Sequence, residues 1–127
     1  MPILPQNVGS IFMILTLCFI AFPRKVLREC HRALIQEGRI AIGFIPRQSP
    51  WGRFYLEKKK QGHSIYRFAK FYSVQEVENM VITAGFSIQG IFSTLFQKPG
   101  EVKIQEKPMK GYRSQAGFLV LIGERVG

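Results

Sequence analysis

The sequence predicts one α/β domain in which buried parallel strands are flanked by helices. Residues between Pro23 and Gly38 carry apolar side chains at three- and four-residue spacing, which is typical of an amphipathic helix. Two apolar runs, Ile11–Leu15 and Ile40–Ile45, lie on either side of that helix. The second run does not alternate with polar residues, which indicates a strand covered on both faces. A strand, a helix and a second buried strand form a right-handed parallel unit.

The predicted first helix begins at Pro23, because proline suits a first helical position, where its missing N–H leaves no bond unmade. Gly38 is expected to end the helix in a positive-φ conformation. The apolar stripe comprises Val26, Leu27, Cys30, Ala33 and Leu34. The opposite face, expected to be solvated, comprises Arg24, Lys25, Arg28, Glu29, His31 and Arg32.

The segment after the second strand is predicted to be a loop followed by a short helix. Pro46–Gly52 has the composition of a loop. Arg53–Lys60 is interpreted as a helix that turns Phe54 and Tyr55 inward and leaves its run of lysines in solvent.

A second clear helix start lies at Ser73. Ser73 and Glu76 have the spacing of a capping box, in which each side chain accepts a backbone N–H of the other residue. The pattern predicts a helix over Val74–Ala84, and Gly85 is expected to close it.

Two strands and a long connection complete the predicted order. Phe86–Phe96 alternates imperfectly and is interpreted as a strand, whereas Ala116–Ile122 is a continuous apolar run typical of a buried strand. Lys98–Gln115, with two prolines and two glycines, is expected to be a loop or a long hairpin connection.

The charge balance leaves a nucleic-acid-binding function open. The 127 residues contain 18 Lys and Arg against 8 acids, all Glu, for a net charge of +10. Such a charge attracts polyanions, and the absence of Asp disfavours carboxylate-caged Mg²⁺. One hypothesis is therefore a basic module in which aromatic residues of Tyr55–Tyr72, with His63, Tyr66 and Phe68 among the basic residues, bind RNA or DNA.

A second alternative is a small membrane-associated protein anchored through residues 8–22, with the basic residues that follow at the lipid headgroups. The apolar run Val8–Phe22 is shorter than the roughly 20 residues that span a bilayer, so a buried strand is preferred over a transmembrane span. Cys18 and Cys30 lack metal or redox spacing and are expected to be buried free thiols in a reducing compartment, the cytoplasm. Neither His31 nor His63 has a second ligand at metal spacing, so no metal site is predicted.

Several segments together resemble a known family. Leu27–Gly38 reads LRECHRALIQEG and precedes an apolar strand, and Phe71–Val77 reads FYSVQEV. Ala84, Gly85 and Phe86 follow the later helix, and Gly117–Val120 (GFLV) opens the final strand. In this order and spacing they resemble the C-terminal half of a class I S-adenosylmethionine-dependent methyltransferase, of the type 11 methyltransferase group.

The resemblance implies a partial Rossmann-like sheet, with parallel strands plus a C-terminal antiparallel strand pair, and S-adenosylmethionine as cofactor. Leu15, Thr16 and Leu17 are then the cofactor-side neighbours. Trp51, Tyr55 and Tyr66 are candidates for lining the part of the site that binds the methyl acceptor. The acceptor is a small molecule or a molecule of unknown class. The alternative is that the three aromatic residues only pack against the core. No catalytic residue is assigned.

The resemblance also implies that parts of the family's site are not encoded here. The family's glycine-rich turn and its ribose-binding acid have no counterpart in this sequence. We therefore expect residues 1–127 to form a single partial domain without the N-terminal cofactor-binding half, a truncated product with little or no activity alone. Ile11–Leu15 would be an uncovered apolar edge, which a partner, a membrane or another chain would have to cover.

Overall fold

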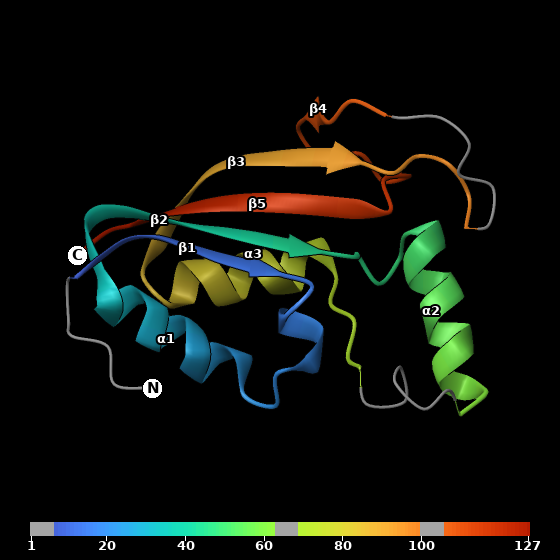
Figure 1. Cartoon of the computed structure of the whole chain (residues 1–127), viewed down its shortest axis with the longest axis horizontal. Coiled ribbons are helices and arrows are strands. Elements are labelled where there is room, and N and C mark those ends of the chain that lie inside the picture. The colour runs from blue at the N-terminus through green and yellow to red at the C-terminus, as the bar shows by residue number, and fades with distance from the viewer. Residues whose placement is uncertain (1–6, 63–68, 100–105) are drawn as a thin grey trace.

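The computed structural model describes residues 7–62, 69–99 and 106–127, and its order of elements follows the predicted one (Figure 1). The strands are β1 (Val8–Ile14), β2 (Leu34–Phe44), β3 (Phe86–Thr94), β4 (Met109–Lys110) and β5 (Phe118–Arg125). The helices are the 3₁₀ turn η1 (Leu17–Phe19), α1 (Pro23–Ala33), α2 (Pro50–Lys60) and α3 (Val74–Thr83).

The strands of the described residues form one sheet in the order β1-β2-β5-β3-β4. β1 and β2 are parallel, with Ile11 opposite Ile40, and the other neighbouring strands are antiparallel. This arrangement confirms the predicted α/β fold with a parallel pair and a C-terminal antiparallel pair. It also leaves β1 at one edge of the sheet, as the sequence predicted.

Helices α1 and α3 cover one face of the sheet (Figure 1). The core between them is apolar because alternate residues of β2 and β5 point toward the helices. The largest fully buried side chains include Leu27, Ile40, Ile42, Val77, Val81, Phe86, Leu119 and Leu121.

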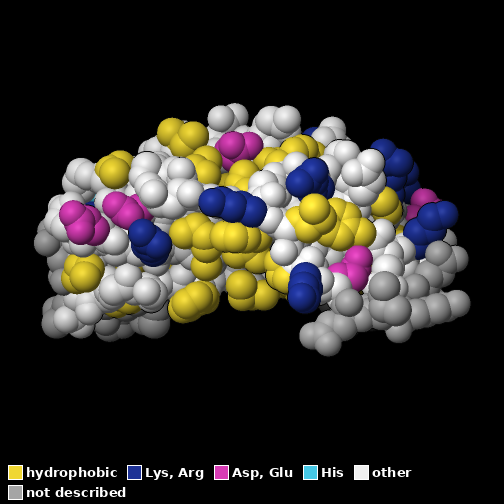
Figure 2. Space-filling model, turned by 90° about the horizontal axis from the view of Figure 1, so that it is seen from above, with side chains coloured by type: hydrophobic (Ala, Val, Ile, Leu, Met, Phe, Trp, Pro, Cys, Tyr) yellow, Lys and Arg dark blue, Asp and Glu magenta, His cyan; other side chains and the backbone are white. Residues whose placement is uncertain are grey.

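The side of the sheet away from α1 and α3 presents hydrophobic side chains to solvent. Figure 2, seen from that side, shows them gathered in the middle of the surface with Lys and Arg around them. On the edge strand β1, Phe12 is 74% exposed and Ile14 is 51% exposed, whereas Met13 between them is buried. Contiguous exposed apolar surface is typical of interaction sites.

The predicted end of the first helix is wrong. α1 ends at Ala33, and Leu34 already belongs to β2, where it pairs with Val8. Gly38 lies in the strand, and the positive φ of +64° belongs to Glu37. Gly38 is needed for a close approach instead, because a Cβ there would lie 2.8 Å from the Ile35 carbonyl oxygen.

The solvated position predicted for His31 is also wrong. His31 Nε2 lies 3.0 Å from the Val126 carbonyl oxygen, and its ring packs edge-on against Phe86. A Cβ on Gly85 would lie 2.7 Å from the imidazole. His31 therefore joins α1 to the start of β3 and the end of β5, which are paired neighbours in the sheet. His63 lies outside the described residues.

The start and the end of α3 are confirmed. The Ser73 N–H donates to Glu76 Oε1 at 2.9 Å, and the Glu76 N–H donates to Ser73 Oγ at 3.1 Å, which is a complete capping box. Gly85 has a φ of +101° just beyond the helix. β3 follows directly, and the segment predicted as a long connection contains the short strand β4.

Helix α2 begins three residues earlier than predicted, at Pro50, because Ser49 caps it by accepting the Gly52 N–H at 2.9 Å. Tyr55 is half-buried and stacks on Phe71, as the inward prediction requires. Phe54 is 40% exposed, so its inward prediction is wrong; its ring instead packs on Trp51 and Tyr55 at the surface.

Candidate functional site

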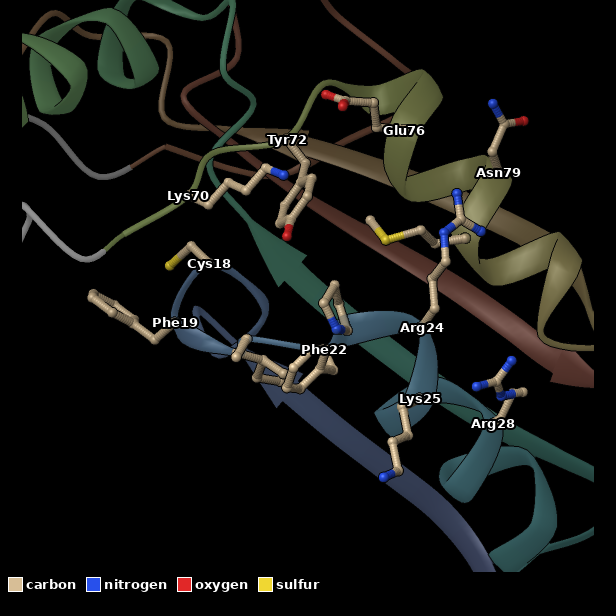
Figure 3. Close-up of a pocket in the computed structure, with 14 residues that line it drawn as sticks. Cys18, Phe19, Phe22, Arg24, Lys25, Arg28, Lys70, Tyr72, Glu76 and Asn79 are labelled. Atoms are coloured by element: carbon tan, nitrogen blue, oxygen red, sulfur yellow. The ribbon is translucent and has the colours of Figure 1, made fainter.

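A pocket of about 730 Å³ opens where β1 ends and α1 begins. Residues 18–22 and the start of α1 form one wall, and Lys70, Tyr72 and the first two turns of α3 form the other (Figure 3). In open α/β sheets, ligands bind beyond the carboxyl ends of the parallel strands. The pocket adjoins that end of β1 and is therefore the candidate functional site.

The predicted cofactor-side residues form the turn that leaves β1. Leu15 has a φ of +55°, and its N–H donates to the Gly43 carbonyl at 2.8 Å, so the turn is fixed to the end of β2. Thr16 is exposed, and its hydroxyl donates to the Ile14 carbonyl at 3.1 Å. Leu17 is 1% exposed and belongs to the core. Leu15 and Thr16 are exposed, but none of the three residues lines the pocket of about 730 Å³, whose wall begins at Cys18.

Four basic residues line the pocket, Lys25 on α1 among them, and they come from two directions. Arg24 and Arg28 lie on α1, and Lys70 approaches from the segment before α3, with its Nζ 5.4 Å from the centre of the Tyr72 ring. Figure 3 shows Arg24 reaching from α1 toward Asn79 on α3. The Lys70 N–H donates to the Cys18 carbonyl at 2.7 Å, which holds the two walls together.

The one carboxylate lining the pocket among the described residues is Glu76, and it already has partners. It accepts the Ser73 N–H, and its Oε1 lies 3.3 Å from Arg47 Nη1. The Ser73 hydrogen bond, with Arg47 as a smaller contribution, lowers the pKa of Glu76. Burial raises the pKa of the neighbouring Tyr72 phenol, which keeps it protonated.

The predicted acceptor-side aromatics do not meet in this pocket. Trp51 donates from its indole N–H to the Gln97 carbonyl at 2.7 Å, and its ring covers Gly117, where a Cβ would lie 2.1 Å from the indole. Tyr55 stacks on Phe71. Trp51 thus packs α2 against the segments that follow β3 and precede β5, and Tyr55 packs it against the segment before α3, in agreement with the packing alternative. Tyr66 lies outside the described residues.

Both cysteines are free and half-buried. Burial raises the pKa of the Cys18 thiol and of the Cys30 thiol, so neither is an activated nucleophile. In the described parts of the chain, no three His, Cys, Asp or Glu side chains come close enough to hold a metal ion.

The pocket itself could not be assembled from the sequence. Its two walls come from residues 18–28 and 70–80, which are about fifty positions apart and share no motif. Lys70, Tyr72 and Asn79 were therefore missed as site residues. The only available signal was the concentration of basic residues after Pro23.

A solved structure shares this arrangement over nearly the whole chain. A crystal structure of an S-adenosylmethionine-dependent methyltransferase from Thermotoga maritima matches with a TM-score of 0.92 at 29% identity. The match covers 99% of this chain and 60% of that one. The chain therefore has the fold of class I S-adenosylmethionine-dependent methyltransferases.

The Thermotoga maritima protein is described as a possible histamine N-methyltransferase. A Haloferax volcanii methyltransferase, solved in complex with the Trm112 methyltransferase activator, has a TM-score of 0.68 at 15% identity; the match covers 98% of this chain and 57% of that one. An uncharacterized protein of Mycobacterium tuberculosis is 34% identical over 121 residues, which are 94% of this chain and 42% of that protein. The chain thus spans less than half of the mycobacterial relative's length. No family model matches the chain.

The two alternative functions gain no support from the structure. Residues 8–14 form a strand and residues 17–19 a 3₁₀ turn, and no helix of the described residues is long and apolar enough to cross a membrane. Phe71 and Tyr72 are buried, and Tyr55 is stacked on Phe71, so these rings do not form a platform for bases.

Proposed function

We propose that residues 1–127 supply the acceptor-side part of an S-adenosylmethionine-dependent methyltransferase domain. The observation that carries this proposal is the turn at Leu15 and Thr16, which leads from the parallel strand β1 into residues 18–22 that line the pocket. The chain shares this fold with a methyltransferase to which it is 29% identical in sequence. In this proposal Leu15 and Thr16 contact the cofactor, and Leu17 holds their turn against the core. S-adenosylmethionine, when bound, supplies the methyl group.

The described residues fit only one side of that cofactor. A ribose diol is usually held by a carboxylate, but Glu76 is paired with Arg47 and the helix cap. The sequence also has no glycine-rich strand-turn-helix to approach the cofactor closely. We therefore propose that a further segment supplies these groups and that this chain alone has little or no activity.

The edge of the sheet indicates where such a segment would bind. Phe12 and Ile14 on β1 are exposed, and a groove of about 600 Å³ runs between β1 and α1. An open apolar edge strand favours pairing with another strand. We propose that the remaining part of a methyltransferase fold, in the same or a partner chain, covers β1. The free thiols Cys18 and Cys30 are consistent with the cytoplasm.

The test is calorimetric titration of S-adenosylmethionine in two samples. The first is the chain alone. The second is the chain mixed with the segment of the Thermotoga maritima protein that lies outside the matched region. We expect saturable binding only in the mixture. Micromolar binding by the chain alone would contradict the missing-segment account, and no binding by a stable complex would contradict the methyltransferase function.

A further inference from the structure

The pocket carries an excess of positive charge. Arg24, Lys25, Arg28 and Lys70 line it, and in the described part of the chain none of the four has an ion-pair partner. The carboxylate of Glu76 is 3.3 Å from Arg47 and interacts only weakly with Lys70, so it leaves most of this positive charge uncompensated. Lys70 lies over the Tyr72 ring, whereas the two arginines have no anionic partner among the described residues, so a ligand anion could bind them.

The position of the arginines on α1 is unfavourable for the helix itself. Arg24 lies in the first turn, where the helix dipole favours negative charge, and that turn contains no acid. Arg28 follows at i+4, where like charges repel. An anion between the two guanidinium groups would relieve both effects. An arrangement that costs stability locally is expected at a functional position.

The same pocket offers apolar surface next to its charges. Phe22 is 71% exposed, Phe19 is 51% exposed, and both line the pocket together with Met80. Figure 3 shows Phe19 and Phe22 on the wall opposite α3. The volume, about 730 Å³, lies in the range of small-molecule sites, about 300–1,000 Å³.

We propose that this pocket binds a small molecule with a carboxylate and an apolar ring, and that this acid is the methyl acceptor. Arg24 and Arg28 bind the carboxylate, since a guanidinium matches carboxylate geometry with two parallel hydrogen bonds. Phe19 and Phe22 contact the ring. The proposal rests on the proposed function, and it differs from the Thermotoga maritima neighbour's description, because a cationic amine such as histamine would be repelled here.

The test compares two probes with the same ring and opposite charge, phenylacetate and phenethylamine, titrated into the full chain at low salt and followed by NMR. We expect saturable binding of phenylacetate and none of phenethylamine. The double variant Arg24→Gln/Arg28→Gln should lose about tenfold or more in affinity for phenylacetate. The control Arg53→Gln/Lys60→Gln removes the same charge from α2, outside the pocket, and should bind like the parent.

Three results would overturn the inference. They are no binding of phenylacetate, equal binding of both probes, and equal losses in the two double variants. The S-adenosylmethionine titration of the mixed sample is measured on the same variants and separates the two proposals. If the cofactor binds and phenylacetate does not, only the acceptor class is wrong. If phenylacetate binds and the cofactor does not, the acid pocket stands and the methyltransferase function fails.

Discussion

Ile11 of β1 lies directly opposite Ile40 of β2 in a parallel register. This pairing brings the end of β1 beside the end of β2, and it fixes the Leu15 turn through a hydrogen bond to the Gly43 carbonyl. It also makes β1 the outermost strand, with one edge unpaired in the described sheet. The candidate pocket and the open edge are thus two consequences of one strand pairing.

Substitutions at neighbouring positions of β1 should have different effects on stability, because one position is exposed and the other is buried. Phe12→Ser should change the free energy of unfolding by less than about 0.5 kcal/mol, because Phe12 is 74% exposed. It should also lower the aggregation of the isolated chain. Met13→Ala, at the buried neighbouring position, should cost about 2–5 kcal/mol. Urea unfolding checks both values, and equal losses would mean that Phe12 is buried in solution.

The first turn of α1 should gain stability from a change that removes acid binding. Arg24→Glu places a carboxylate at the positive end of the helix dipole and at i,i+4 from Arg28. We expect stabilisation of about 0.3–1 kcal/mol in thermal unfolding. Lys60→Glu, in the last turn of α2, places the same charge at the opposite helix end and should destabilise. A loss of stability in Arg24→Glu would show that Arg24 has a structural partner.

The capping box of α3 should make stability depend on pH. Hydrogen bonding to Ser73, and less so Arg47, lowers the folded-state pKa of Glu76. A lowered pKa stabilises the protein above the unfolded pKa, about 4.5, and this stabilisation is lost as the pH falls through the folded value.

Glu76→Gln tests this dependence, because glutamine keeps the capping geometry but does not titrate. We expect the free energy of unfolding of the variant to fall less than that of the parent protein between about pH 5 and pH 3. Ser73→Ala should instead cost about 1 kcal/mol near pH 7. If the free energy of unfolding depends on pH in the same way for Glu76→Gln and the parent protein, the Glu76 carboxylate does not contribute to the pH dependence of stability.

The fluorescence of Trp51 reports on how α2 packs against Gly117. The sequence contains one tryptophan, and a Cβ at Gly117 would lie 2.1 Å from its ring. Gly117→Ala should displace the indole, shift its fluorescence to longer wavelength and cost about 1–3 kcal/mol. Gly9→Ala, with no atom within 4 Å of the added Cβ, should change neither property. An unchanged spectrum in Gly117→Ala would refute this packing.

The sequence predicted the elements better than their ends. The apolar stripe that contains Leu34 is consistent with a longer helix, but Leu34 pairs with Val8 in the sheet, and tertiary pairing overrides local propensity there. His31 has the spacing of a solvated residue, yet it contacts Val126, 95 positions away. The capping box at Ser73 was predictable because all of its contacts are local.

The candidate site was predictable only in part for the same reason. The turn at Leu15 follows from the apolar run before it and from the family resemblance. Lys70 and Asn79 reach the pocket only because the sheet brings α3 beside α1. The aromatic residues Trp51 and Tyr55 have a spacing that does not distinguish ligand contact from packing, and the structure gives both of them packing partners.

Hydrogen–deuterium exchange across β1 measures whether the rest of a methyltransferase domain binds at this edge of the sheet, as we propose. The chain is measured alone and with the complementary segment of the Thermotoga maritima protein. Peptides covering Val8–Ile14 should gain protection in the mixture, while those covering Met109–Lys110, at the other sheet edge, should not. Protection confined to Met109–Lys110, or unchanged exchange at β1 in a formed complex, would show that the rest of the domain does not bind at β1.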